Sequence, residues 1–400
     1  MIPLEEARDY VLSVARRRDP SMIAVAEALG LVLAEQIVSD EAIPPFANTA
    51  MDGFAVRSVD VVDAPCDLTI VGTVAAGPAP DVVVGPGEAA RIMTGAVIPE
   101  GADAIIMVEL TSAVDETVTV QQPVPVGNHI RSAGDDIESG DVVFEAGTVL
   151  TAGHLGVLCS LGRREVLAHP RARVGVFSTG DELVDEDRDL RPGEIRDSNR
   201  RTLLSLVALS GAEPIDLGLV RDDEDAIEAA LRSGAGSCDA LITSGGVSMG
   251  DFDFVKAVLS RIGDMRWMQI AIKPAKPFAF GTVDGTPIFG LPGNPVSSMV
   301  SFELFARPGL RSMMGHDAPL RPAIAAVADE DLLRRPDGKT HFLRTIAEVQ
   351  PDGRLHVRSA GGQGSHMLWA MAKSNALAVV PDGDGVERGG DVDVLLLDGG

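Results

Sequence analysis

Acidic side chains stand near glycine at several points of this 400-residue chain, a combination that suits phosphate chemistry. Glu182, Asp222 and Asp253 each lie in a polar segment that comes after a short apolar run. Carboxylates hold a hard cation such as Mg²⁺. Backbone amides of glycine-rich turns hold phosphate groups. Together these residue types favour a site for a metal ion and a phosphate-bearing ligand.

A glycine pair follows the apolar run Ala240–Thr243. Adjacent glycines let backbone amides turn toward an anion, because no Cβ atom stands in the way. Asp251 suits the N-cap of the next helix, which leaves the carboxylate of Asp253 for a cation. The predicted anion-binding residues of this loop are Ser244, Gly245, Gly246 and Ser248.

Two other interpretations of this loop stay open at this stage. On its own, a glycine pair is also typical of an ordinary strand-to-helix turn. The run Gly246–Gly250 matches the G-x-S-x-G pattern of a serine hydrolase, with Ser248 as the nucleophile. In that motif the helix begins directly after the serine, whereas Gly250 and Asp251 intervene here, and no HGGG-type oxyanion motif precedes the loop.

Two lysines on a proline-stiffened segment, Lys273 and Lys276, indicate a second place for an anion. Surface lysines in ordinary ion pairs are the alternative. The segment Leu291–Pro295 leads into a helix whose first turn offers free N–H groups and the positive end of its dipole. A helix that Asn294 merely caps is the alternative there.

Three further polar residues, Asp52, Arg131 and Asp136, lie in predicted loops, and Asp-Gly at position 52 is most often a turn. No two histidines stand four residues apart, which excludes a zinc site of the HExxH type. The three well-separated cysteines lack any C-x-x-C spacing, which argues against a zinc site or a disulfide framework.

Composition narrows the class of protein. The formal net charge of −25 argues against a general binder of nucleic acid or of anionic membranes, because both need a basic face. A small anionic ligand needs only a local cationic pocket. No stretch reaches the roughly 18 apolar residues that span a bilayer. The first 20 residues lack the apolar core of a signal peptide, so we expect a cytoplasmic protein.

Elements that could position these residues alternate between strand and helix from 172 to 315. This pattern predicts βαβ units around a mostly parallel sheet, with the ligand beyond the carboxyl ends of the strands. The loops that hold Glu182, Asp222 and Ser244 follow the first three strands. The predicted strands are Val174–Phe177, Ile215–Leu219 and Ala240–Thr243, and the helices Asn199–Leu209, Glu224–Leu231 and Phe254–Ile262. A further helix begins after Asn294 and runs to Ala306, with Pro308 ending it.

The rest of the chain divides into three more predicted domains. A discontinuous helical domain takes residues 1–44 and 141–170, with helices at 3–18, 23–29 and from Thr151 to Leu161. Short apolar runs between glycines and prolines indicate an inserted β domain at 45–140. The α/β domain spans 171–320. A C-terminal β domain follows at 321–400, with an Asp352-Gly353 hairpin.

Taken in order, these segments resemble the molybdopterin molybdenumtransferase family (MoeA), which includes the gephyrin E domain. The resemblance covers nearly the whole chain. It implies a multidomain α+β and α/β fold, with a molybdopterin-binding α/β domain, an inserted β domain and a C-terminal β domain. The matching strings are Pro45–Ala55, Arg91–Gly95, Ser178–Leu183, Asp197–Asn199, Ser244–Asp253, Lys273–Gly281, Leu291–Ser297 and Gly362–His366.

The resemblance implies an enzyme that inserts molybdenum from molybdate into adenylylated molybdopterin, releases AMP and uses Mg²⁺. Glu182, Asp222 and Asp253 would hold the cation. Lys273 and Lys276 would bind phosphate or molybdate. The other residues it implicates are Asp52 as catalytic, and Thr94, Arg131, Asp136, Ser244, Gly245, Gly246, Ser248, Pro292, Gly293, Asn294, Pro295 and Ser297 in substrate binding.

The family forms homodimers, so the resemblance also implies an active site shared across the interface. Asp52, Thr94, Arg131 and Asp136 would then reach the partner's α/β domain. Other readings stay open: a molybdopterin adenylyltransferase-like enzyme, or a relative that inserts another oxyanion metal such as tungstate. A pure scaffold is disfavoured, because the chain has no linker and no fused partner domain. The family often has glycine where Ala275 stands and lysine where Gln269 stands.

Overall fold

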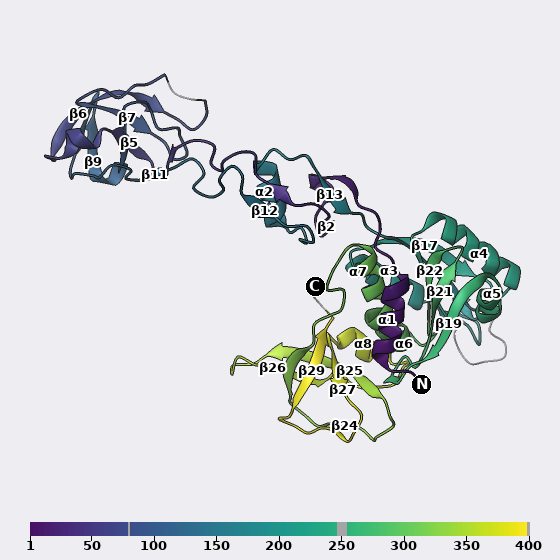
Figure 1. Cartoon of the computed structure of the whole chain (residues 1–400). Coiled ribbons are helices and arrows are strands. Elements are labelled where there is room, and N and C mark those ends of the chain that lie inside the picture. The colour runs from purple at the N-terminus through teal and green to yellow at the C-terminus, as the bar shows by residue number, and fades with distance from the viewer. Residues whose placement is uncertain (79–80, 246–253, 398–400) are drawn as a thin grey trace. The chain divides into compact units, whose positions relative to one another are not determined.

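The computed structural model describes residues 1–400 except 79–80, 246–253 and 398–400 (Figure 1). The chain folds as two compact units. The first comprises Met1–Ile23, Ala28–Ala34 and Leu167–Gly400, and the second comprises Ala24–Glu27 and Glu35–Val166. No helix in the described ranges is long and apolar enough to cross a membrane.

A six-stranded sheet organises the α/β part of the first unit. Its order is β17-β14-β18-β22-β21-β19. The first four of these strands are parallel, and β21 pairs antiparallel with both β22 and β19. The mostly parallel sheet predicted from the alternating pattern is thus confirmed. The strands are β14 (Arg173–Thr179), β17 (Glu213–Val220), β18 (Ala240–Ser244), β19 (Gly263–Gln269), β21 (Pro277–Val283) and β22 (Thr286–Leu291).

Helices cover both faces of this sheet, and each face has its own apolar core (Figure 1). Val174 and Ile242 pack with α1 (Leu4–Val14) and α3 (Asn199–Leu209). Phe177 and Leu241, on the same two strands, pack on the opposite face with α4 (Glu224–Ser237) and α5 (Phe254–Ile262). Burial on both faces explains why these strands read as continuous apolar runs.

The observed helices match the predicted ones closely. α3 (Asn199–Leu209) and α5 (Phe254–Ile262) have the predicted bounds. α4 runs from Glu224 to Ser237, longer than predicted, and the Asp223 carboxylate caps it by accepting from the Ala226 N–H at 2.9 Å. Its last turns are held by tertiary packing, because Gly234 lies so close to the sheet that a Cβ would approach Leu241 to 2.8 Å.

The helix that was expected to end at Pro308 continues past it. α6 (Pro295–Ser301) runs through a π-type segment, Phe302–Ala306, into α7 (Arg307–Met313). The Arg307 N–H bonds to the Phe302 carbonyl, five residues back. This shift places Pro308 in the first turn of α7, where its missing N–H breaks no helical bond. The predicted end was therefore wrong.

A closed β barrel forms the C-terminal part of the first unit and confirms the predicted β domain (Figure 1). The ring runs β25-β26-β23-β29-β27 and back to β25. The short strand β20 (Ile272–Lys273), which comes from the α/β part, adds parallel to β25. The barrel strands are β23 (Ile324–Ala328), β25 (Thr340–Val349), β26 (Leu355–Ser359), β27 (Ala376–Val380) and β29 (Asp391–Leu396), with α8 (Leu368–Lys373) and the pair β24 (Leu332–Leu333) and β28 (Gly385–Val386).

The N-terminal region differs from the sequence expectation. The helix predicted at 23–29 is wrong, since the chain there forms β1 (Ser21–Ala24) and the 3₁₀ turn η1 (Val25–Glu27). The first predicted helix is present as α1, but its buried face packs into the α/β core. The helix expected after Thr151 is α2 (Ala152–Ser160), in the second unit. The predicted division into four domains stays a prediction.

The second unit contains a six-stranded sheet of order β8-β5-β7-β6-β10-β9, as the predicted β insertion requires. Its strands enclose a core of small and branched side chains. The strands are β5 (Gly53–Val56), β6 (Cys66–Val74), β7 (Glu88–Ile92), β8 (Ala104–Met107), β9 (Thr111–Val114) and β10 (Thr117–Val120), with the pairs β4 (Asn48–Thr49) and β11 (Ile130–Arg131), and β3 (Ile37–Val38) and β12 (Val142–Phe144).

Candidate functional site

The loops predicted to bind a ligand meet at the carboxyl ends of the parallel strands. Asn199, the first residue of α3, ties them together: its side-chain amide donates to Ser244 Oγ at 2.8 Å and to the Gly293 carbonyl at 2.7 Å. The Gly245 N–H donates to the Leu291 carbonyl at 3.0 Å. The structure therefore brings Ser244, Gly245 and Gly293 together, as predicted.

Gly245 has a backbone angle that ordinary residues avoid, with φ +96°, and its Cα packs against Gly293. A Cβ built on Gly293 would lie 3.8 Å from that Cα. The two loops therefore run side by side without side chains between them, which leaves bare backbone facing the strand ends. Gly246 and Ser248 lie outside the described residues.

Two of the predicted cation ligands, Glu182 and Asp222, occupy the same edge of the sheet. Glu182 follows β14 and its carboxylate folds back over Gly180, where a Cβ would lie 2.7 Å from Oε2. The Asp222 N–H bonds to Asp181 Oδ1 at 3.4 Å, which brings the loops after β14 and β17 together. In the described ranges no three His, Cys, Asp or Glu side chains gather as a metal site would need. Asp253 lies outside those ranges, so the cation triad stays a prediction.

A buried ionic network fixes this edge. Arg200 is 2% exposed and bonds to Asp197 at 3.0 Å and to both oxygens of Asp216 at 2.5 and 2.6 Å, with Asp185 as a third carboxylate partner. Burial lowers the pKa of Arg200, but its bonds to these carboxylates outweigh burial and raise it. Ser178, in β14, donates to Asp197. The charge of Arg200 is therefore offset by carboxylates of the protein itself.

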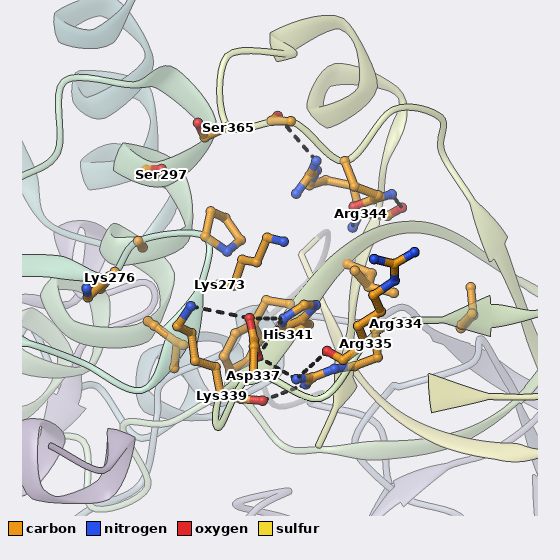
Figure 2. Close-up of a pocket in the computed structure, with 18 of the residues that line it drawn as sticks. Lys273, Lys276, Ser297, Arg334, Arg335, Asp337, Lys339, His341, Arg344 and Ser365 are labelled. Atoms are coloured by element: carbon orange, nitrogen blue, oxygen red, sulfur yellow. Dashed lines mark hydrogen bonds and ion pairs between the residues drawn. The ribbon is translucent and has the colours of Figure 1, made fainter. Parts of the chain in front are cut away.

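A cavity of about 950 Å³ lies between β20, α6 and the barrel, and it contains both predicted lysines (Figure 2). Lys273, Lys276 and Ser297 line it, as expected of an anion site. The described lining residues include six lysines and arginines against two aspartates, in a chain whose net charge is −25. Residues that the sequence had not singled out complete the wall: Arg334, Arg335, Asp337, Lys339, His341, Arg344 and Ser365.

Arg344 is the most unusual of these residues, because it is 1% exposed yet has no carboxylate partner in the part of the chain that the structure describes. Its guanidinium donates to the carbonyls of Gly362 and Gly364 at 3.1 and 3.3 Å, and its Nε has no described partner. Burial lowers the pKa of Arg344 to about 10. A buried cation without a counter-charge is costly, and a bound anion would offset that cost.

The cavity and the sheet edge are joined through the start of α6. Gly293 contacts Asn199 at the sheet edge, and Ser297, one turn into the helix, lines the cavity. Between them the Val296 N–H donates to the Ser365 carbonyl at 3.1 Å. Pro292, Asn294 and Pro295 belong to this connecting segment. One ligand could therefore contact both places.

The second unit holds its own polar cluster. The Thr94 N–H and hydroxyl both donate to Asp52 Oδ1, at 2.6 and 2.8 Å, and these bonds lower the pKa of Asp52. Gly53 admits no side chain, since a Cβ would lie 1.9 Å from the Ile106 carbonyl. Asp52 is thus a fixed carboxylate as well as the turn that the sequence suggested.

The two other residues predicted in this unit lie further along the chain. Arg131 stands on β11, paired with Asn48 of β4. The Asp136 N–H donates to the Ile43 carbonyl at 3.0 Å. Whether either acts with Asp52 stays a prediction.

Sequence reasoning missed Arg344 and His341 because both stand in a strand pattern that reads as barrel wall. The sequence offered only a weak signal for Arg344. It stands within β25 near apolar residues, and a buried arginine usually makes an ion pair. Ser365 stands within a matching string, Gly362–His366, to which no role had been given. Only the parallel pairing of β20 with β25 brings Lys273 next to these residues.

Comparison with known proteins gives one consistent picture. Three family models match in order: "MoeA N-terminal region (domain I and II)" over residues 2–162, "Probable molybdopterin binding domain" over 175–312 and "MoeA C-terminal region (domain IV)" over 327–397. A molybdopterin molybdenumtransferase of Haemophilus influenzae is 40% identical over 383 residues, which is 95% of this chain and 94% of that protein.

Two further comparisons agree. Molybdopterin molybdenumtransferase 2 of Mycobacterium tuberculosis is 38% identical over 392 residues, 96% of both chains. A crystal structure of the molybdopterin biosynthesis MoeA protein of Pyrococcus horikoshii superposes with a TM-score of 0.80 at 30% identity. It covers 99% of this chain and 100% of that one.

Proposed function

This chain belongs to the MoeA family of molybdopterin molybdenumtransferases and is an enzyme of molybdenum cofactor biosynthesis, and on that premise we propose its reaction. The enzyme inserts molybdenum from molybdate into adenylylated molybdopterin and releases AMP. The single observation that carries this proposal is that Arg344, buried and without a carboxylate partner in the described part of the chain, lines the same cavity as Lys273.

Molybdate is a tetrahedral dianion and suits the charge of this cavity. Lys273 and Arg344 would supply the positive charge, and Ser297 and Ser365 would add hydroxyl groups as hydrogen-bond donors. Because burial removes water from around Arg344, its attraction for an oxyanion is stronger than at the surface. Lys276 lines the same cavity and would bind molybdate or a phosphate of the second substrate.

Adenylylated molybdopterin would bind at the sheet edge. The bare backbone at Gly245 and Gly293 and the hydroxyl of Ser244 suit its phosphates. Gly246 and Ser248 would extend this contact. The start of α6 then carries the ligand toward the cavity, since Pro292–Ser297 reaches both places. In this arrangement catalysis is mainly positioning and electrostatic stabilisation.

The carboxylates of the edge fit a divalent cation such as Mg²⁺. Glu182 and Asp222 stand in adjacent loops there and offer the oxygen donors that Mg²⁺ prefers. With Asp253 they would hold the ion. A cation bound at this place offsets the negative charge that develops on AMP as the phosphoanhydride bond breaks.

We further propose a homodimer whose active site is shared. Asp52, held ionised by Thr94, would act on the partner's sheet edge together with Arg131 and Asp136. A complementation assay tests this point. Heterodimers of Asp52→Ala and Lys273→Ala chains should regain one normal site per dimer, which is about half the activity of a wild-type dimer, whereas each variant alone stays inactive.

Two alternatives remain in view. Tungstate would occupy the same cavity, because lysine, arginine and hydroxyl groups separate tetrahedral dianions only weakly. A molybdopterin adenylyltransferase-like activity is disfavoured by the barrel, which supplies Arg344 and Ser365 to the cavity although adenylyl transfer would need only the α/β part. We place the enzyme in the cytoplasm, in keeping with the free thiols of Cys66, Cys159 and Cys238.

The test incubates the pure protein with adenylylated molybdopterin and Mg²⁺ and follows AMP release with and without molybdate. AMP release that requires molybdate and yields metal-loaded pterin would support the proposal. Release without metal loading, or AMP attachment from ATP, would move the assignment to one of the alternatives. Repeating the reaction with tungstate compares the two oxyanions directly.

A further inference from the structure

The wall of the cavity contains an aspartate–histidine pair that the proposed reaction has not used. His341 Nε2 lies 3.3 and 3.2 Å from the two carboxylate oxygens of Asp337 (Figure 2). His341 is only 7% exposed and lines the cavity. It is also the register partner of Lys273 across the parallel strands β20 and β25. The imidazole therefore stands beside the lysine that we assign to the anion.

Asp337 is held firmly in place. Arg334, whose side chain is 2% exposed, contacts Asp337 Oδ1 at 2.6 Å, and Lys339 Nζ contacts Oδ2 at 3.2 Å. The Asp337 N–H donates to Asp382 Oδ1 at 3.0 Å. A carboxylate fixed in this way orients the ring of His341 and selects its tautomer. With the Nε2–H donated to Asp337, Nδ1 is the nitrogen that keeps a free electron pair.

Protonation of His341 is set by groups from several elements. Burial has the largest influence and lowers the pKa of His341 below its usual 6.5, and the hydrogen bond to Asp337 raises it. The charges of Arg334 and Lys273 lower it further. The net shift of the pKa is downward, which favours the neutral imidazole, the form that can accept a proton. The charged groups around it are Lys273 from β20, Arg334 after β24, Asp337 and Lys339 before β25, and Asp382 after β27.

We propose that His341, oriented by Asp337, transfers protons during metal insertion at this cavity. This inference rests on the proposed function. Two S–H bonds of the dithiol and one Mo–O bond break, two Mo–S bonds form, and both thiol protons leave on the departing oxygen as water. Molybdenum keeps its oxidation state. His341 Nδ1 takes a proton from a thiol and delivers it to that oxygen.

Chemical rescue separates proton transfer from a structural role. His341→Ala should lower molybdate-dependent turnover about 100-fold, within the usual contribution of a general acid–base group. Added imidazole should restore turnover several-fold and in a saturable way, because the shortened side chain leaves room on the cavity wall. Molybdate affinity should change less than twofold.

His356 offers a matched control on the neighbouring strand β26. It too lies between carboxylates, with Asp329 at 2.7 Å and Asp352 at 3.0 Å, but it lines no part of the described cavity. His356→Ala should keep normal turnover and show no response to imidazole. A response of this variant would mean that imidazole acts elsewhere.

His341→Asn provides the second variant, since its amide keeps a polar group at this position but cannot transfer a proton. It should be as slow as His341→Ala and should lose the acidic limb of the pH–rate profile. Normal turnover of His341→Asn, or an impaired His341→Ala that imidazole does not rescue, would overturn the proton-transfer role. If the wild-type protein fails to load molybdenum, the proposed function is overturned instead. This result is obtained before any variant is made.

Discussion

Two buried arginines of the first unit show how the same side chain serves two purposes. Arg200, at the sheet edge, is 2% exposed and contacts three carboxylates, from Asp185, Asp197 and Asp216. Arg344, in the cavity, is 1% exposed and donates only to backbone carbonyls among the described residues. The first charge is balanced within the fold, whereas the second has no carboxylate partner in the described ranges and would be balanced by the proposed anion.

Two histidines repeat this contrast. Bonds to Asp329 and Asp352 raise the pKa of His356, whereas burial lowers the pKa of His341, which lines the cavity. The cavity therefore favours the neutral form of His341, near Arg344, which has no carboxylate partner among the described residues. Charge balance, more than burial, distinguishes the functional groups of this unit from the structural ones.

The largest expected effect is on stability at the sheet edge. Arg200→Met should destabilise the protein by about 3 to 5 kcal/mol, because it leaves the buried Asp197 without its counter-charge. Urea unfolding followed by circular dichroism measures this. Arg201→Met serves as control, since Arg201 is 61% exposed and lies 3.4 Å from Asp185 and Asp216, the two other carboxylates that Arg200 contacts. Equal losses in both variants would contradict the account of the network.

The second effect is on turnover in the cavity. Arg344→Met should lower molybdate-dependent AMP release about 100-fold, the usual loss when one preorganised donor to a developing charge is removed. Its free energy of unfolding should stay within about 1 kcal/mol of wild type, since no described carboxylate is left unpaired. If Arg344→Met lost as much stability as Arg200→Met but kept its turnover, Arg344 would be the structural residue, against our account.

A smaller effect is expected in the second unit. Thr94→Val removes the hydroxyl bond to Asp52 but keeps the backbone bond. The loss of one hydrogen bond, worth about 1 kcal/mol, should lower turnover about fivefold. Because the bonds from Thr94 lower the pKa of Asp52, the acidic limb of the pH–rate profile should move to higher pH.

Thr119→Val is the matched control for this experiment. Thr119 of β10 donates to Asp67 of β6 at 2.6 Å in the same unit, and neither is a predicted site residue. Its turnover and pH profile should match those of wild type. A fivefold loss in both variants would assign the effect to the fold of the unit.

The smallest effect separates the two histidines by the pH dependence of stability. The raised pKa of His356 means that its contribution is present below the unfolded value of 6.5 and is lost as pH rises through the folded value. His341 has a lowered pKa, so its contribution is present above 6.5 and is lost as pH falls. Urea unfolding midpoints are measured at pH 5.5 and 8.5. Relative to wild type, His356→Asn should lose more stability at pH 5.5, and His341→Asn should lose more at pH 8.5. The same pH dependence of stability in both variants would contradict this difference between the two histidines.

The sequence predicted the parts of the fold that local patterns determine. Strands that alternate with helices predicted the α/β sheet, and the bounds of α3 and α5 agree with the predicted ones, whose ends were set by the glycines that follow. The predicted helix end at Pro308 was wrong because a π-type segment shifts the hydrogen-bond register, which no residue pattern announces. The predicted helix at 23–29 was wrong because the chain there forms the end of a strand and a 3₁₀ turn, and its short apolar run was ambiguous.

The residues of the candidate site also fall into those that local patterns predicted and those that they did not. Ser244, Gly245, Gly293 and the lysines were found because glycine and proline mark loops and strand ends. Arg344 and His341 were missed because their role depends on pairing between β20 and β25, strands far apart in the sequence. A charged residue in a strand indicates a candidate binding site only once the structure shows that no described residue pairs with it.

Calorimetric titration of molybdate into wild type, Arg344→Met and Arg354→Met tests the central claim most directly. Arg354 is an exposed arginine of the same barrel, paired with Asp391 at 2.7 Å, and serves as the matched control. The account predicts at least tenfold weaker binding for Arg344→Met and wild-type binding for Arg354→Met. Equal affinity in all three proteins would contradict the claim that the unpaired guanidinium of Arg344 holds the oxyanion.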